Sequence, residues 1–415
     1  MRRLIAWLGR FAAALLFRRV EVVGRNRYPR NRPVLLVANH FNGFVDPVLV
    51  TAALGRTPRF VAKATLAGVP LAGWVLRRIG VVFVRRRVDA PSGQVDNDDA
   101  FVECHRALAD GDVVAIFPEG TTHDRPQLDP LRTGAARIAL GARDAGIHDL
   151  VIVPVGLTFA DKIALRSKAL VQFGGPIELD GCQDARALTA RIDAGLRDVT
   201  LDFPDVETAI ALELAAQIRL SSTAVPDPRL ALRYDLARRL GRAAPDAQTR
   251  VRSVVGRYTA LLAGLRLTDV DVIAPTNPTR LLRSAVGIAV LVVVLGGVVA
   301  ATALVNLVPA ALVVLVSLLV HTPVSKGTVR VLVGLVAFPT FWITAAVLAA
   351  DGWLVIVSVL TFALGAVAAI WLVERAMALA RMLLRWQAQR ERIAMIRMAA
   401  DLRAEVQVEV EAVAG

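Results

Sequence analysis

Short apolar segments alternate with helix-like segments over residues 33–178. The apolar segments are rich in Val, Ile and Leu, and they predict strands at residues 34–38, 59–62, 81–85, 113–117, 151–158 and 170–173. Helical periodicity follows near residues 47–54, 66–79, 97–109, 133–145 and 185–200. Because these strands do not alternate polar and apolar positions, the sheet should be covered on both faces. The pattern predicts an α/β domain at residues 21–204, with a mixed sheet flanked by helices.

The first 20 residues, MRRLIAWLGRFAAALLFRRV, combine an apolar segment at residues 4–17 with arginines on both sides. That segment is too short to cross a bilayer, and no small-residue cleavage pattern follows it. We expect residues 1–20 to form an interfacial membrane helix with Trp7 at headgroup depth. A helix docked on the protein core is the alternative.

Residues 205–280 change in character and become polar and charged. Their periodicity predicts helices near residues 205–219, 228–241 and 246–266. We expect a soluble helical connector here.

Three uncharged stretches follow the connector, at residues 284–325, 331–350 and 352–373. At about 20 residues per crossing, they predict a transmembrane region over residues 281–373 with about four helices. The first stretch would form a hairpin that turns at residues 306–309. Its second helix is short, so three spanning helices and one re-entrant segment are the alternative. Residues 374–415 are predicted to form a charged helical tail.

The charges that flank these stretches predict their orientation. Arg280, Arg283, Lys326, Arg330 and Arg375 would share one side of the membrane. The positive-inside rule places that side in the cytoplasm. We therefore expect a multi-pass protein of the cell (inner) membrane, with its N-terminal domain and its tail on the cytoplasmic face.

The net charge of +13 comes from one part of the chain. Residues 1–88 hold 17 basic and only two acidic side chains, Glu21 and Asp46. Such a patch suits an anionic membrane surface or a phosphate-bearing substrate. No DNA- or RNA-binding motif accompanies it, so we expect no nucleic-acid partner. The two cysteines, Cys104 and Cys182, form neither a disulfide framework nor a zinc motif, and we expect no metal site.

The first polar cluster, NHFNGFVD at residues 39–46, directly follows the predicted strand VLLVA. His40 would lie at the carboxyl end of that strand, a usual place for active sites in α/β sheets. Asp46 precedes a proline, which predicts a helix N-cap. The two side chains can meet only if the loop folds His40 back over the start of the helix. A loop histidine beside an ordinary N-cap has the same sequence pattern.

The second cluster, FPEGTTHDR at residues 117–125, also follows an apolar strand. Gly120 permits a ligand to approach the backbone closely, and Glu119 and Thr121 supply polar groups. Arg125 and Arg132 lie near the start of the next predicted helix, and both suit an anionic ligand. A surface loop is the alternative.

A third cluster, GVVFVRRR at residues 80–87, ends another predicted strand in three arginines. On a strand, Arg86 would point opposite to its two neighbours. One arginine can therefore face a site while the others face solvent or lipid headgroups.

Taken in order, these segments resemble the glycerolipid acyltransferases of the phosphatidate pathway. Residues 39–46 resemble the family's first block in a His-x5-Asp form, and residues 80–86 resemble the second. Residues 117–121 resemble the third block, Phe-Pro-Glu-Gly, and residues 151–155 (VIVPV) resemble the fourth. The chain departs from the family at Phe41, because an asparagine-proline pair commonly follows the histidine.

Two further segments are similar to the subgroup that acts on glycerol-3-phosphate and dihydroxyacetone phosphate. They are THDRP at residues 122–126 and LRTGAARIAL at residues 131–140. The resemblance implies an acyltransferase domain followed by a helical connector and a membrane helix block. It also implies a role in phosphatidic acid and phospholipid biosynthesis.

The resemblance implies a membrane-bound enzyme that transfers a fatty acyl group from acyl-CoA or acyl carrier protein to the hydroxyl of a glycerol phosphate. Histidine is the side chain that accepts and releases a proton near neutral pH, so His40 is suited to deprotonate that hydroxyl. Asp46 would accept the other ring N–H of the histidine. Arg86 would bind the acceptor's phosphate, with Arg125 and Arg132 as second choices. Glu119, Gly120 and Thr121 would position the glycerol part, and no cofactor is expected.

Two alternatives stay open. The acceptor could be 1-acylglycerol-3-phosphate, which carries the same phosphate and would yield phosphatidate. A protein of another class, a non-catalytic lipid-binding membrane protein or a transporter, would also combine a basic domain with membrane helices. The apolar stretches at residues 284–325, 331–350 and 352–373 contain none of the acidic or basic residues typical of transport pathways, which argues against a transporter.

Overall fold

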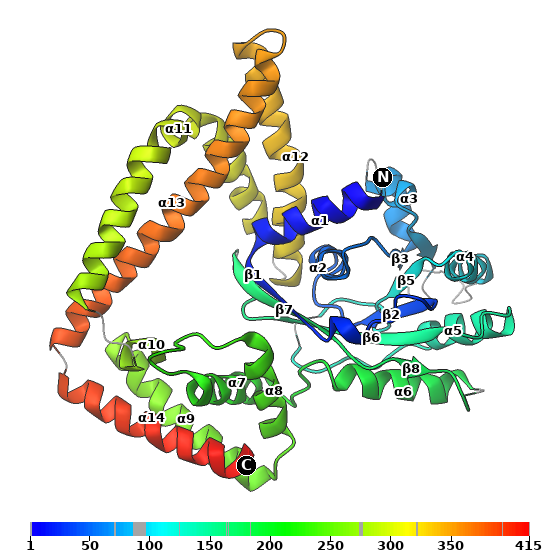
Figure 1. Cartoon of the computed structure of the whole chain (residues 1–415), viewed down its shortest axis with the longest axis horizontal. Helices are drawn as coiled ribbons and strands as arrows, with labels where there is room; N and C mark the ends of the chain where they lie inside the picture. Colours follow the sequence, from blue (N-terminus) through cyan, green and yellow to red (C-terminus); the bar gives the residue numbers. More distant parts are fainter. Residues whose placement is uncertain are drawn as a thin grey trace. The chain divides into compact units, whose positions relative to one another are not determined.

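The computed structural model describes residues 2–69, 72–85, 97–123, 125–162, 164, 166–182, 184–273, 277–320, 323–391 and 393–414. The chain folds into two compact units (Figure 1). The first comprises Met1–Ala209 and Arg229–Ala231, and the second comprises Ile210–Pro228 and Leu232–Gly415.

An eight-stranded mixed sheet forms the centre of the first unit. Its strands are β1 (Phe17–Val23), β2 (Val34–Ala38), β3 (Arg59–Lys63), β4 (Val82–Val84), β5 (Val113–Ile116), β6 (Val151–Phe159), β7 (Ser167–Phe173) and β8 (Ile177–Glu178). The order across the sheet is β1-β7-β6-β2-β5-β3-β4, with β8 paired to β6. Strands β2 to β6 run parallel, whereas β7 and β8 pair antiparallel with β6.

Helices cover both faces of this sheet, as the uniformly apolar strands predict. Every residue of β2 is buried, and so is nearly all of β6. On one face, α4 (Asp98–Ala109), α5 (Gly134–Asp144) and α6 (Ala185–Arg197) bury one continuous apolar core with the sheet. Figure 1 shows α1 (Arg2–Leu16) and α2 (Val45–Leu54) on the opposite face. A short 3₁₀ turn, η1 (Arg25–Arg27), follows β1, while η2 (Ala64–Gly68) and α3 (Ala72–Arg78) follow β3.

The predicted strands are all present, with ends that differ by at most three residues, and two strands, β1 and β8, are additional. The helix predicted over residues 1–20 ends at Leu16, and the next residues form β1. Arg166 fixes this end, because its guanidinium donates to the carbonyls of Ala14 and Phe17 at the helix terminus. The next residues, FRRVEVV, then pair in parallel with β7 at one edge of the sheet.

The second unit contains the predicted connector and the tail. Its helices beyond the membrane candidates are α7 (Val206–Leu220), α8 (Leu230–Gly241), α9 (Pro245–Leu265), α10 (Asp269–Ile273) and α14 (Ile393–Ala414), of which α7 and α8 begin in the first unit. The tail helix α14 packs against α9 through a buried polar cluster. Arg403 Nε donates to Asp269 at 2.8 Å, and the Tyr258 hydroxyl donates to the same carboxylate oxygen at 2.8 Å.

Among the described residues, three helices are long and apolar enough to cross a membrane, where about four helices were predicted. They are α11 (Pro278–Leu318), α12 (Pro323–Ala349) and α13 (Leu354–Glu391). The turn predicted at residues 306–309 lies inside α11. Asn306 is satisfied there by neighbouring helices, since it donates to the Phe362 carbonyl and accepts from Trp342 Nε1. Pro309 interrupts the helix hydrogen bonding, and Figure 1 shows α11 bent.

Candidate active site

Two loops at one edge of the sheet form the candidate site. Residues 39–44 leave the carboxyl end of β2, and residues 117–133 leave the end of β5. The two strands are parallel neighbours, with Val37 opposite Ile116. The His40 loop and the Glu119 loop therefore emerge side by side, at the edge where α/β folds bind their ligands.

His40 and Asp46 meet directly. The Nδ1 atom of His40 lies 2.9 Å from Oδ2 of Asp46, whose side chain is fully buried. The ring of His40 stacks on the ring of Phe117, with centroids 4.1 Å apart. Its side chain keeps 15% of its surface exposed. Among the described residues, the hydrogen bonds of the ring engage Nδ1 only, which leaves Nε2 for a substrate.

Asp46 does not cap the helix as predicted, because α2 begins one residue earlier at Val45. Phe44 occupies the N-cap position, and Oδ1 of Asn42 accepts from the backbone N–H groups of Phe44 and Val45 just before and at the start of the helix. Asp46 instead accepts the Asn42 N–H at 2.7 Å and the His40 ring. This arrangement lets a pair six residues apart meet at the start of a helix.

Burial raises the pKa of the Asp46 carboxyl above its ordinary value, and the hydrogen bond from His40 opposes that rise. Oδ1 of Asp46 is buried and has no hydrogen-bond partner among the described residues. The charge of Asp46 is therefore costly in this position and depends on the His40 ring. Such a carboxylate favours formation of the imidazolium beside it.

Phe41, where the chain departs from the family it resembles, packs the His40 loop in place. Its ring meets the ring of His123 edge-on at 5.6 Å and that of Phe159 at 6.3 Å. Nζ of Lys162 lies 3.8 Å from the centre of the same ring. Aromatic packing and a cation–π contact thus restrain the loop that lacks the proline.

Glu119 connects the two loops. Oε1 accepts the backbone N–H of His40 at 2.7 Å. Oε2 lies 2.5 Å from Nε2 of His123 and accepts the backbone N–H of Asp129 at 2.8 Å. The Glu119 side chain is fully buried, so these contacts, rather than solvent, satisfy the carboxylate.

The other predicted binding residues lie around this loop. Gly120 has a φ of +72°, and a Cβ there would lie 2.7 Å from Nε of Arg132. Thr121 and Arg132 are exposed. Arg125 donates to Asp129 at 2.6 Å. All four positions lie on the loop between β5 and α5 that carries Glu119.

Arg86 lies outside the described residues. The residue before it, Arg85, directly follows β4, and β4 is separated from β2 by β5 and β3. Asn97 holds the backbone there, accepting from the Arg85 N–H at 2.8 Å and donating to its carbonyl at 2.9 Å.

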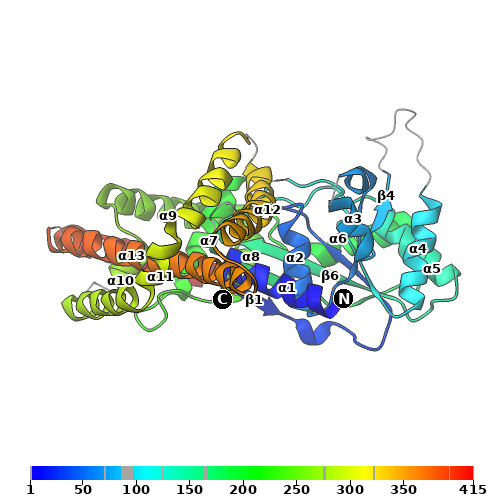
Figure 2. The ribbon, with the colours of Figure 1, turned by 90° about the horizontal axis from the view of Figure 1, so that it is seen from above.

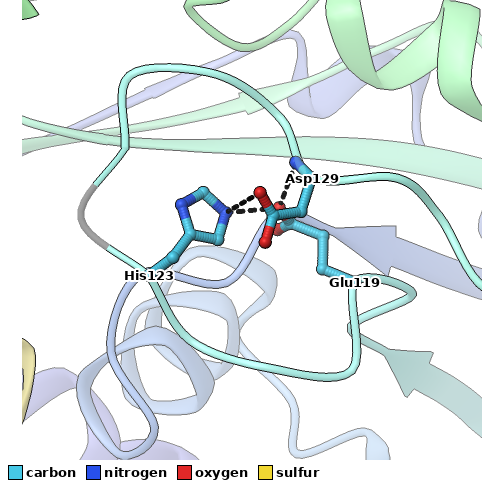
Figure 3. A group of neighbouring side chains, drawn as sticks. All are labelled: Glu119, His123 and Asp129. Atoms are coloured by element: carbon cyan, nitrogen blue, oxygen red, sulfur yellow. Dashed lines mark hydrogen bonds and ion pairs between the residues drawn. The ribbon is translucent and has the colours of Figure 1, made fainter.

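Glu119, His123 and Asp129 are also the group whose donor atoms could hold a metal ion, because these atoms lie within 4.8 Å of one another. Figure 3 shows the three side chains converging. At 2.5 Å, however, His123 and Glu119 contact each other directly, whereas two zinc ligands, each about 2 Å from the metal, stand further apart. The trio is built as a hydrogen-bonded cluster.

Asn39 and His123 are the buried polar residues that sequence reasoning missed. The Asn39 side chain donates to the Leu157 carbonyl at 2.9 Å and accepts the Leu157 N–H at 2.7 Å, which joins the end of β2 to β6. The only signal for either residue is its place inside a polar block that follows an apolar strand.

Comparison with known proteins identifies the domain. The acyltransferase family model matches residues 19–158. Glycerol-3-phosphate O-acyltransferase 2 of Saccharomyces cerevisiae is 32% identical over 30% of this chain and 18% of its own length. A lyso-ornithine lipid O-acyltransferase of Brucella abortus is 31% identical over 43% of this chain and 65% of its own.

Among solved structures, the chain is similar to the 1-acyl-sn-glycerophosphate acyltransferase PlsC of Thermotoga maritima. Its TM-score is 0.38 at 23% identity, over 47% of this chain and 76% of that chain. The chain spans about a fifth of the length of the yeast relative named above. Residues 19–158 therefore match the acyltransferase family model, and over this part the chain is similar to glycerolipid acyltransferases.

Proposed function

We propose that the protein transfers a fatty acyl group from an acyl thioester to a hydroxyl of a glycerol phosphate acceptor. The hydrogen-bonded pair of His40 and Asp46 beside the Glu119 loop carries this proposal. Glycerol-3-phosphate and dihydroxyacetone phosphate are the acceptors we favour, and the product enters phosphatidic acid and phospholipid biosynthesis.

The chemistry follows from the position of Nε2 of His40. Nε2 accepts the proton of the acceptor hydroxyl while its oxygen bonds to the thioester carbonyl carbon. Asp46 stabilises the imidazolium that forms, through the Nδ1 contact of 2.9 Å. The C–S bond then breaks, and the proton passes from His40 to the departing thiolate. No acyl-enzyme is needed, in agreement with the burial of both cysteines away from the site.

We assign the acceptor's phosphate to Arg86, with Arg132 and Arg125 as the alternatives on the Glu119 loop. Arg125 is already paired with Asp129, whereas Arg132 makes only one long contact, to the Glu119 carbonyl at 3.4 Å. Glu119, Gly120 and Thr121 shape the position of the glycerol part. The donor is acyl-CoA or acyl carrier protein.

The experiment is an acyl-transfer assay with the full chain in nanodiscs and radiolabelled acyl-CoA. Glycerol-3-phosphate, dihydroxyacetone phosphate and 1-acylglycerol-3-phosphate are tested side by side, each also with acyl carrier protein as donor. We expect the first two acceptors to be acylated. Preferential acylation of 1-acylglycerol-3-phosphate would establish the second candidate, which the names of plant relatives favour. Lipid binding without turnover of any acceptor would contradict the proposed activity and favour a non-catalytic protein.

We further propose that α1 lies on an anionic membrane. Its large apolar side chains face outward, and Trp7 and Phe11 are 54% and 53% exposed. The small residues Ala6 and Ala13 are buried instead, and α1 packs on α2. Beside this stripe, a pocket of about 350 Å³ is lined by Arg10, Arg18, Arg19 and Arg166. An exposed apolar stripe next to arginines suits the boundary between acyl chains and phosphate headgroups.

A fluorescent label tests this orientation of α1. In nanodiscs, an environment-sensitive fluorophore on Phe11→Cys should be quenched by spin-labelled lipid, whereas the same label on Val102→Cys of α4 should not. Val102 is a matched control because it is also exposed. The native thiols should not interfere, since both are buried and burial raises the pKa of Cys104 to about 12. Equal quenching at both positions, or none at Phe11, would contradict the proposal.

The second unit supports an even number of membrane crossings. Arg385 and Gln389, near the end of α13, contact Asp271 of α10, which immediately precedes α11. The two ends of the membrane block therefore lie together. If α12 and α13 each cross the membrane once, α11 must begin and end on the same side of the membrane. Its 41 residues span about 60 Å, enough for a bent helix that enters and turns back. We place these ends, and the catalytic unit, on the cytoplasmic face of the cell (inner) membrane.

A further inference from the structure

His123 contacts the Glu119 carboxylate, and the proposed reaction gives His123 no role. His123 is buried, and Nε2 of its ring lies 2.5 Å from Oε2 of Glu119. The other oxygen of the same carboxylate holds the backbone N–H of His40 at 2.7 Å. A continuous hydrogen-bonded path therefore runs from the His123 ring to the main chain of the proposed base. Figure 3 shows His123 and Asp129 meeting Glu119 from opposite sides of one loop.

We propose that His123 is a positioning residue for acyl transfer, which acts through Glu119 to fix the main chain of His40. The inference rests on the proposed function, because it assigns a role within the same reaction.

The hydrogen-bonding pattern defines what His123 contributes. Its Nδ1 atom is buried and has no partner among the described residues, so the contact through Nε2 is the ring's hydrogen bond there. Glu119 accepts from two backbone N–H groups, those of His40 and Asp129. Among the described residues, His123 supplies the one side-chain donor that contacts this carboxylate, and that contact turns it toward both N–H groups. Nε2 of His123 lies 3.9 Å from Oδ1 of Asp129, beyond hydrogen-bonding distance.

Loss of the His123 donor would loosen the carboxylate at its Oε2 end. A buried carboxylate that loses a donor must rotate, admit water or take up a proton. Each of these changes the contact at Oε1 and so moves the His40 backbone. A displacement of about 1 Å at a catalytic group can lower a rate about 100-fold. The effect should appear in turnover, because Glu119 transmits it to the His40 backbone, whereas the acceptor's phosphate is assigned to arginine side chains.

A second contact supports the same role. The ring of Phe41, the residue that follows His40, meets the His123 ring edge-on at 5.6 Å. His123 therefore restrains the His40 loop twice, by a hydrogen bond through Glu119 and by direct packing on Phe41. Substitutions that keep one contact and remove the other can separate these two effects.

The test compares His123→Gln, whose amide can still donate to Glu119, with His123→Leu, which keeps bulk and loses the donor. His105→Leu is the matched control, because His105 is half-buried and makes one contact to the Ile138 carbonyl at 3.1 Å. All are assayed as full chains in nanodiscs, with kcat, both KM values and Tm measured.

We expect His123→Leu to lower kcat at least tenfold with both KM values within about twofold, while His123→Gln keeps at least a third of wild-type kcat. His105→Leu should leave kcat unchanged. Equal losses in the Gln and Leu variants, a loss confined to the acceptor's KM, or a loss matched by His105→Leu at equal Tm would overturn the inference. If the wild-type chain acylates no acceptor, the proposed function fails first, and the two failures are thereby distinguished.

Discussion

His40→Ala should reduce acyl transfer by roughly 10²- to 10⁴-fold, the contribution typical of a positioned general base. The alanine removes Nε2, the ring nitrogen that the contact of Nδ1 with Asp46 leaves for the acceptor hydroxyl. It should not unfold the domain, since the His40 side chain is partly exposed and its backbone contact to Glu119 remains. The measurement is kcat for the best acceptor in nanodiscs, with unfolding followed in parallel.

His148→Ala is the matched control, because His148 is exposed and lies outside the site. It should retain wild-type turnover. Activity of His40→Ala within tenfold of wild type would show that another group deprotonates the acceptor. The proposed assignment of the base would then be wrong, even if acyl transfer itself is confirmed.

Most of the sheet could be predicted because its central strands are uniformly apolar and buried on both faces. Residues 34–38, for example, form β2 with the predicted bounds. Strand β1 could not be predicted in the same way. Its sequence, FRRVEVV, continues an apolar helix, and it becomes a strand only because β7 offers a parallel partner. Tertiary pairing decided that segment, against the local pattern.

The membrane block shows the same limit of local pattern. Asparagine and proline at residues 306–309 predict a turn when they are taken alone. Inside α11, neighbouring helices satisfy Asn306, and the helix bends at its proline instead of ending. Apolar composition predicted the membrane segments, but packing between α11, α12 and α13 decided where helices end.

The site could be predicted in part. The polar blocks at residues 39–46 and 117–125 each follow an apolar strand, and their order along the chain indicated His40, Asp46 and Glu119. The sequence could not show that the Glu119 carboxylate turns inward to the His40 backbone. Nor could it show that His123 and Asp129 reach the same carboxylate, because those contacts depend on the path of a long loop.

Asp46→Asn should lower kcat by roughly 10²- to 10⁴-fold while the protein stays as stable as wild type or becomes more stable. An amide keeps the shape of the side chain, but it lacks the charge that stabilises the imidazolium. Burial already raises the pKa of Asp46, so the folded protein disfavours the ionised carboxylate. A neutral amide at this position therefore removes the free-energy cost of burying a charge, which favours folding. The same substitution removes the charge that catalysis needs.

The double variant His40→Ala with Asp46→Asn distinguishes this role from a separate one. If Asp46 acts only through the His40 ring, its substitution has nothing left to impair once that ring is gone. The double variant should then turn over within about twofold of His40→Ala alone, as expected for residues that act as one unit. Multiplied losses in kcat would show that Asp46 contributes independently of His40. A lowered Tm for Asp46→Asn would instead assign the carboxylate a structural role, because its contact with the Asn42 N–H also orders the loop.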